Sequence, residues 1–281
     1  MAVDFSTLVP QNNVRLPDAL TVRHGSGPLI GRLILEGDRV AREAGIHLRL
    51  RHDFDELVYL NRTEVARGNW RPIMDTYNPE KADISAENGF WIAGENDAGE
   101  IVTTAAARIY DWPDTTLEDH AVAMFFGRDE GQRCVITTPA AKLISGVVFS
   151  GGTIWVRPDY RGRTLSHLLP RMSRAYSLSR WPLDWLIGYV QRAHVDKGIA
   201  TGYGSRHLGF SIYYPDTSYG EIVLAYSSGQ EAYDDMGIFL DEELSDASGG
   251  RFAVPTPAAA LAHEVTRTSP EGVRQGSSRR S

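Results

Sequence analysis

The feature that most constrains the fold is an apolar run that breaks at a proline and restarts as an amphipathic segment. Residues 153–166 begin strand-like, turn at Pro158 and continue with three arginines. Apolar residues then recur at steps of three, four and seven through Leu178, which predicts a helix with one buried stripe. Pro170 interrupts this pattern by removing a hydrogen bond, so the start of the helix is left open. The apolar run 185–190 is typical of a strand covered on both faces, and a strand–helix–strand crossover is predicted.

The turn that opens this helix is expected to bind an anion. The first N–H groups of a helix have no intrahelical partner, and the helix dipole places partial positive charge there. Arg157, Arg161 and Arg163 add full positive charges to the same turn.

Composition narrows the function classes. The chain has 281 residues, 42% hydrophobic and 23% charged, which is ordinary for a globular protein with a full core. No apolar run approaches the ~18 residues that span a bilayer, and no signal peptide is recognisable, so a cytoplasmic protein without a membrane partner is expected. A formal charge of -7 argues against nucleic acid as a partner. Cys134 is the single cysteine and the histidines lack metal-binding spacing, so no disulfide framework or metal site is expected.

The pattern divides the chain into three parts. Residues 1–45 are interpreted as an N-terminal extension with a helix face that stops at Gly45. Residues 46–228 alternate strand-like and helix-like segments and form the α/β body. Residues 229–281 hold an acidic helix-like piece at about 234–246, expected to present a solvated face, and then a tail too poor in large apolar residues to fold alone.

Further elements of the body follow from alternation, capping residues and turn residues. An insertion between about 111 and 142 could supply substrate contacts. The predicted elements are a strand at 46–51, a helix capped by Asp53 or Asp55 and ending near Ala66, a hairpin of strands at 90–94 and 101–105, and a short helix at 117–126 inside the insertion.

The segment 156–162, which reads V-R-P-D-Y-R-G, resembles the acyl-CoA-binding motif of the GNAT family of N-acyltransferases when taken with the helix and strand after it. The predicted element order over residues 46–228, roughly two thirds of the chain, is similar to that family as well. The resemblance implies a central mixed β-sheet flanked by helices, with acetyl-CoA or another acyl-CoA as co-substrate. It further implies direct transfer of the acyl group, most simply acetyl, to a primary amine of a small molecule or amino acid derivative.

The family's pyrophosphate loop, Q/R-x-x-G-x-G/A, falls on residues 161–166, which read R-G-R-T-L-S. Thr164 and Ser166 replace its two final small residues, and glycine there would let the backbone approach the phosphates without a Cβ in the way. The hydroxyl groups can still donate hydrogen bonds, so we expect an altered site. The resemblance implies these cofactor-binding residues: Ile154, Trp155, Val156, Arg161, Gly162, Arg163, Thr164, Leu165 and Ser166.

A second family pattern, N-x-x-A-x-x-x-Y, keeps its spacing at residues 196–203, with Asp196 in place of Asn and Ile199 in place of Ala. Gly209-Phe210 follows two residues later than the family arrangement has it. In the family this tyrosine often protonates the leaving thiolate, which makes Tyr203 the candidate general acid and Asp196 a candidate cofactor-binding residue. The alternative is that Tyr203 only packs the end of a helix.

No residue stands out as the general base. Many relatives carry a glutamate on the strand before the CoA loop, but residues 147–156 contain no carboxylate. The backbone N–H groups near Ile154 and Val156 would polarise the thioester carbonyl. Four side chains remain as alternatives for the base: Glu87, His120, His167 and His194.

Two other functions stay open. One is an enzyme resembling the N-acyl amino acid synthases, which would use a longer acyl donor and show a wide apolar tunnel. The other is a noncatalytic sensor or binding module, suggested by the altered loop and the missing strand carboxylate. A homodimer stays open as the assembly.

Overall fold

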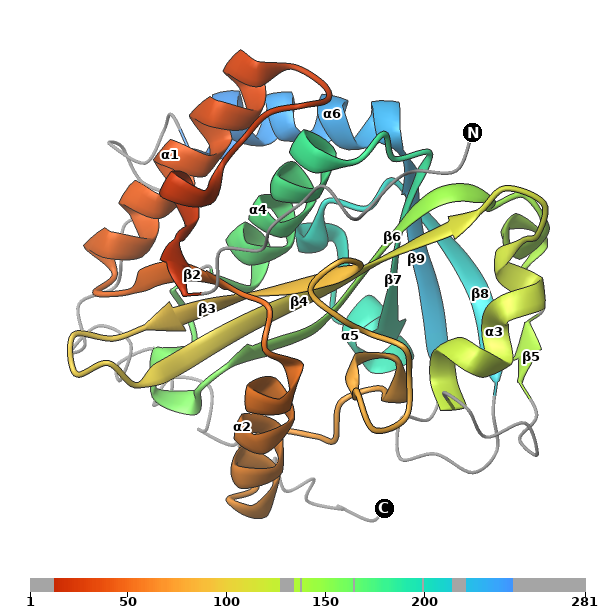
Figure 1. The fold of residues 1–281 in the computed structure, drawn as a ribbon, viewed down its shortest axis with the longest axis horizontal. Coiled ribbons are helices and arrows are strands. Elements are labelled where there is room, and N and C mark those ends of the chain that lie inside the picture. Colours follow the sequence, from red (N-terminus) through yellow and green to blue (C-terminus); the bar gives the residue numbers. More distant parts are fainter. Residues whose placement is uncertain are drawn as a thin grey trace, which may run out of the picture.

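The computed structural model describes residues 13–126, 134–136, 138–163, 165–198, 200–213 and 221–244, which form one mixed sheet with helices on both faces (Figure 1). The nine strands within these residues run in the order β1-β2-β3-β4-β6-β7-β9-β8-β5. The strands are β1 (Val14–Arg15), β2 (His47–Arg51), β3 (Gly89–Glu95), β4 (Ile101–Trp112), β5 (Val135–Ile136), β6 (Gly146–Val156), β7 (Trp185–Gln191), β8 (His207–Tyr213) and β9 (Ile222–Ser228). The helices are α1 (Gly27–Glu43), α2 (Phe54–Ala66), α3 (Leu117–Phe126), α4 (Leu165–Arg180), α5 (Arg192–Asp196) and α6 (Gly229–Ile238), with a 3-10 turn η5 (Ala200–Tyr203) before β8.

The predicted crossover is confirmed. Strand β6, helix α4 and strand β7 follow one another, and β6 pairs with β7 in parallel, whereas the other strand pairs are antiparallel. A parallel pair needs a crossover connection, which α4 provides. The predicted fold class, a mixed α/β sheet flanked by helices, is therefore confirmed.

Local signals explain most element boundaries. Asp53 caps α2 by accepting a hydrogen bond from the Glu56 N–H at 3.1 Å. Helix α1 ends before Gly45, whose φ of 73° favours glycine. The turn between β3 and β4 uses Gly99 at φ 76° in the same way. The short helix expected inside the insertion is α3.

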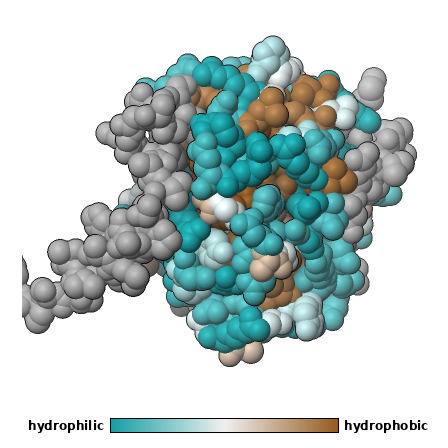
Figure 2. All heavy atoms as spheres, turned by 90° about the vertical axis from the view of Figure 1, so that its left-hand side faces the viewer, coloured by the Kyte–Doolittle hydropathy of each residue, from teal (hydrophilic) through white to brown (hydrophobic). Residues whose placement is uncertain are grey.

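Segment 13–45 shares the main core of the body. Figure 1 shows α1, α4 and α6 together on one side of the sheet, with α2 on the other. Gly37 allows α1 to approach α4 closely, because an added Cβ would lie 2.7 Å from the Met172 sulfur. The division of the chain at residue 45 stays a prediction. Seen from the left of Figure 1, the surface is mainly hydrophilic with small apolar patches (Figure 2).

The acidic segment after residue 229 was expected to face solvent, but one of its acidic side chains is paired inside the fold. Helix α6 begins at a capping box in which the Ser228 side chain accepts from the Glu231 N–H. Asp235 forms an ion pair with the buried Arg171 of α4. The prediction of a solvated acidic face is therefore wrong for Asp235. The pair could not be read from the sequence, because only the tertiary fold brings α4 and α6 together. The predicted tail beyond 244 lies outside the described residues.

Pro170 lies inside α4, in its second turn, and the helix continues through it. The start of this helix, which the sequence did not fix because of Pro170, is at Leu165. Among the described residues, none of the helices is both long and apolar enough to cross a bilayer.

Candidate functional site

The candidate site is a cleft where the two parallel strands separate. β6 and β7 pair only from Val148 with Trp185 to Gly151 with Gly188, and then diverge. A cavity of about 780 Å³ opens beyond that point. Its walls come from the ends of β6 and β7, the first turns of α4, η5 and the loop that follows α2.

The cleft passes from one face of the sheet to the other. On β7, Leu186 packs in the core with α4, whereas Ile187 packs in the core with α3. Because side chains alternate along a strand, Val190 lies on the α4 side and Tyr189 on the opposite side, and both line the cleft. On β6, Trp155 likewise faces away from α4. Residues on both faces of the sheet therefore line the cleft, and we call its side beside α4 and its side beside the loop after α2 the two mouths.

A bulge shapes β6 at the cleft. Its register against β4 shifts between Trp155 and Gly152, so two residues of β6 lie opposite one of β4. Thr153, in the bulge, has a φ of 49°, which is uncommon for a residue with a branched side chain. The buried Thr104 hydroxyl donates to the Thr153 carbonyl at 2.8 Å, and the Thr103 hydroxyl to the Trp155 carbonyl at 2.6 Å. These bonds hold the distorted backbone in place.

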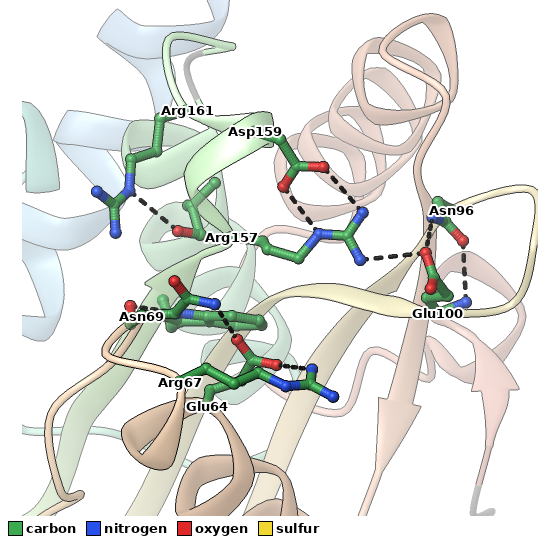
Figure 3. A network of polar contacts seen from close by, with 10 residues as sticks. Glu64, Arg67, Asn69, Asn96, Glu100, Arg157, Asp159 and Arg161 are labelled. Carbon is green, nitrogen blue, oxygen red and sulfur yellow. Dashed lines mark hydrogen bonds and ion pairs between the residues drawn. The ribbon is translucent and has the colours of Figure 1, made fainter.

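The bulge leaves a backbone donor facing the cleft. The Arg157 N–H donates to the Val102 carbonyl of β4 at 2.8 Å. Successive backbone groups alternate in direction, so the Val156 N–H points away from β4, toward the cleft. The Ile154 N–H lies in the bulge, where this alternation does not set its direction. The Val156 carbonyl accepts a hydrogen bond from Arg161 Nε at 3.2 Å (Figure 3).

The three arginines of the turn have different roles. Arg161 and Arg163 line the cleft, and Arg163 lies 4.3 Å over the Tyr160 ring while donating to the Ala44 carbonyl at 2.9 Å. Figure 3 shows Arg157 directed the other way, where it forms ion pairs with Asp159 at 2.8 Å and Glu100 at 3.1 Å that raise its pKa. The prediction that Arg157 adds free positive charge to the turn is wrong, because two carboxylates neutralise it.

The start of α4 borders the same mouth. Leu165, Ser166 and Pro170 line the cleft. Because Pro170 has no N–H, it cannot donate to the Ser166 carbonyl one turn earlier. Gly162 has a φ of 79° with open space around it, so its backbone conformation rather than crowding favours glycine. Thr164 lies outside the described residues.

Tyr203 lies in the cleft, whereas Asp196 does not. Burial raises the pKa of the Tyr203 phenol, so it stays protonated near neutral pH. Its turn is fastened to α4 by Arg171, which donates to the Gly202 carbonyl at 2.6 Å. Asp196 is exposed and pairs with Arg192 at 2.9 Å. The predicted residues that the structure brings together are Ile154, Trp155, Val156, Arg161, Gly162, Arg163, Leu165, Ser166 and Tyr203.

Of the four candidate bases, only His194 lines the cleft. Burial, followed by the charges of Lys197 and Arg71, lowers the pKa of His194 and keeps the ring neutral near pH 7. His120 instead bonds the Thr115 hydroxyl at 2.7 Å, and Glu87 is exposed elsewhere. His167 lies close to Gly202, outside the lining. Among the described residues, no group of three His, Cys, Asp or Glu could hold a metal ion.

The sequence did not reveal two parts of the cleft. The loop 68–74 forms one mouth, where Trp70 stacks on Trp155 with ring centroids 4.8 Å apart. The available signal was a tryptophan two residues after Gly68, the glycine that follows α2. Arg174 of α4 also lines the cleft, and burial lowers its pKa to about 10. Its Nη2 donates to the Ser205 hydroxyl at 2.8 Å, a contact that helical periodicity cannot predict.

Comparison with solved structures finds distant likeness to acyltransferases. A mutant of the spermidine N-acetyltransferase SpeG from Vibrio cholerae aligns with 66% of this chain and 95% of its own, at 11% identity and a TM-score of 0.39. FeeM, an N-acyl amino acid synthase from uncultured soil microbes, aligns with 66% of this chain and 93% of its own, at 14% identity and a TM-score of 0.41. Arabidopsis thaliana NAA60 in complex with acetyl-CoA covers 64% of this chain and 98% of its own, at 13% identity and a TM-score of 0.36. No family model and no curated protein matches the chain. At these values no family is established, and the function below is inferred from the cleft.

Proposed function

We propose that the cleft binds an acyl-CoA and that the protein transfers the acyl group to a primary amine of a small molecule, as the resemblance to the GNAT family implies. The observation that carries this proposal is the divergence of β6 from β7 beyond Gly151 and Gly188, which leaves the Val156 N–H facing the cleft beside a helix start and two arginines. The arrangement offers donors for an amide-rich chain and positive charge for its phosphates.

The residues present fit such a ligand. The unpaired edge of β6 can accept the pantetheine amides in the way that a sheet edge accepts another strand. Gly151 and Gly188 lie opposite each other at the closed end of the cleft, and both line it. Arg161, Arg163 and the first N–H groups of α4 would hold the pyrophosphate at the mouth beside α4.

The chemistry assigned to the chain consists of positioning and proton transfer. The Val156 N–H would polarise the thioester carbonyl as the amine attacks its carbon. As the carbon–sulfur bond breaks, Tyr203 would donate its proton to the leaving sulfur. His194, neutral near pH 7, would accept the proton that the amine loses. Transfer is direct, so no covalent nucleophile of the protein is needed.

The apolar lining favours a longer acyl donor as a second candidate. The wall on the side away from α4 includes Met74, Ile187 and Ile222. Such side chains would cover an acyl chain longer than acetyl.

Calorimetric titration with acetyl-CoA, desulfo-CoA and a long-chain acyl-CoA tests the proposal. We expect binding to the unmodified protein and at least a tenfold loss in Arg161→Ala, because a charge-assisted phosphate contact is removed. Arg39→Ala is the matched control, because Arg39 pairs with Glu36 and Glu43 on α1 and does not line the cleft. The preferred acyl length separates the two enzyme candidates. Absence of binding to all three ligands would refute the use of acyl-CoA and would favour the noncatalytic binding module, with a ligand other than acyl-CoA.

A further inference from the structure

The charged groups along the cleft carry one sign. Among the described residues that line it, none is Asp or Glu. The whole chain nevertheless carries a formal charge of -7. The basic lining residues are Arg71, Arg161, Arg163, Arg174 and His194. A cleft of this composition favours anionic ligands and disfavours polycations.

Arg71 stands at the mouth away from α4, on a loop whose backbone is held in place. The buried Asn61 side chain donates to the Arg71 carbonyl at 2.8 Å and accepts the Ile73 N–H at 3.2 Å. The Trp155 indole N–H donates to the Asn69 carbonyl at 3.2 Å (Figure 3). These contacts bracket Arg71, so its backbone is positioned before any ligand arrives.

The Arg71 side chain is free while its neighbours are paired. It is exposed, and it forms no hydrogen bond or ion pair with the described part of the chain. A guanidinium presents donors in a fork that matches a carboxylate. The neighbouring arginines are occupied: Arg62 by Glu80, Arg67 by Glu64 and Arg192 by Asp196.

Arg71 shares the cleft with the candidate base. Its charge acts on His194, which lines the same cleft. In an α-amino acid the amine and the carboxylate share one carbon. A carboxylate held by Arg71 would therefore keep the amine within the cleft, near the imidazole that accepts its proton.

We propose that the acceptor amine carries a carboxylate, that Arg71 binds this carboxylate, and that amino acids are accepted in preference to simple amines and polyamines. This inference rests on the proposed function and names the acceptor class for the same cleft. Arg161 and Arg163 serve the donor at the other mouth, so Arg71 is the specificity residue for the acceptor.

Matched acceptors test the proposal. The assay measures the release of free CoA. The acyl donor is acetyl-CoA, or the long-chain acyl-CoA where calorimetry shows it to be preferred. The acceptors are phenylalanine and phenethylamine, tryptophan and tryptamine, and spermidine. We expect kcat/KM to be at least tenfold higher for each amino acid than for its decarboxylated amine. Arg71→Gln should lower kcat/KM for the amino acids by about 10- to 100-fold and change kcat/KM for the simple amines far less, because only the amino acids carry the carboxylate that the removed charge would bind. Arg71→Lys should restore part of the loss.

Arg62→Gln is the matched control, an exposed arginine of α2 that does not line the cleft. Equal use of the decarboxylated amines or spermidine, or an unchanged Arg71→Gln variant, would overturn the acceptor assignment alone. No turnover of any acceptor while the acyl-CoA binds would overturn the proposed acyl transfer together with the acceptor assignment, and would leave acyl-CoA binding standing. Loss of all acyl-CoA binding in the unmodified protein would overturn the proposed function and this inference together. An Arg71→Gln protein with a lowered melting temperature or weakened acyl-CoA binding would indicate a structural role and overturn it too.

Discussion

The ion pair between α4 and α6 gives a stability prediction that can be worked from its geometry. Arg171 Nε lies 2.9 Å from Asp235 Oδ2, and the side chains are only 6% and 22% exposed. Asp235 is also the countercharge of the buried Arg174, whose pKa burial lowers to about 10. Asp235→Asn keeps the shape of the side chain but leaves two buried guanidinium groups with no negative charge between them.

The expected cost follows from burial. Removing one partner of a buried ion pair costs about 3–5 kcal/mol, because the other charge stays buried without compensation. Partial exposure of Asp235 lets water recover some of this, so we expect Asp235→Asn to lower the free energy of unfolding by about 2–4 kcal/mol. In the control Glu80→Gln, both partners of the Arg62–Glu80 pair are 61% exposed. Such surface pairs contribute about 0–1 kcal/mol.

Urea denaturation at pH 7, followed by tryptophan fluorescence, measures both variants. The Asp235→Asn midpoint should fall with little change in slope, as for a loss of stability without a change in the surface exposed. Arg171 also holds the Gly202 carbonyl at 2.6 Å, so the variant should loosen the turn that carries Tyr203 and weaken acyl-CoA binding. A loss no larger than that of Glu80→Gln would refute the assignment of Asp235 as an essential buried countercharge.

Three further predictions concern the cleft. Gly188→Ala should fold normally, because the added Cβ would lie at an ordinary contact distance of 3.4 Å from the Gly151 carbonyl oxygen, but it should weaken acyl-CoA binding in calorimetry at least tenfold. Gly152→Ala would place its Cβ 2.7 Å from the buried Tyr77 hydroxyl, so it should instead lower the free energy of unfolding measured in urea by about 1–3 kcal/mol. Tyr203→Phe should lower kcat by about 10²-fold or more with an unchanged melting temperature, and unaltered turnover would contradict its role as the acid. An NMR titration should give the His194 ring a pKa below its ordinary value of 6.5, because burial and nearby positive charges disfavour the imidazolium. Arg71→Gln should raise the His194 pKa, because it removes one of these charges. A pKa at or above 6.5 in the unmodified protein would contradict the described surroundings of His194.

Local sequence determined which elements form. The period of the apolar residues predicted β6, α4 and β7, and the Asp53 cap predicted where α2 begins. Each of these signals involves residues a few positions apart, so the chain carries them regardless of its tertiary fold. The described candidate residues between Ile154 and Ser166 share a cleft for the same reason, because they lie on one continuous strand-to-helix turn.

Only the tertiary structure decided which charges are free. Arg157 is neutralised by Glu100, 57 residues away, and Arg171 by Asp235, 64 residues away, whereas Arg71 has no such partner in the described part of the chain. Asp196 differs, because its partner Arg192 lies four residues earlier in the same helix, α5; what the tertiary structure decided is that this pair lies outside the cleft. Periodicity records which face of an element is buried, but the charge that a ligand meets depends on contacts between elements far apart in the sequence.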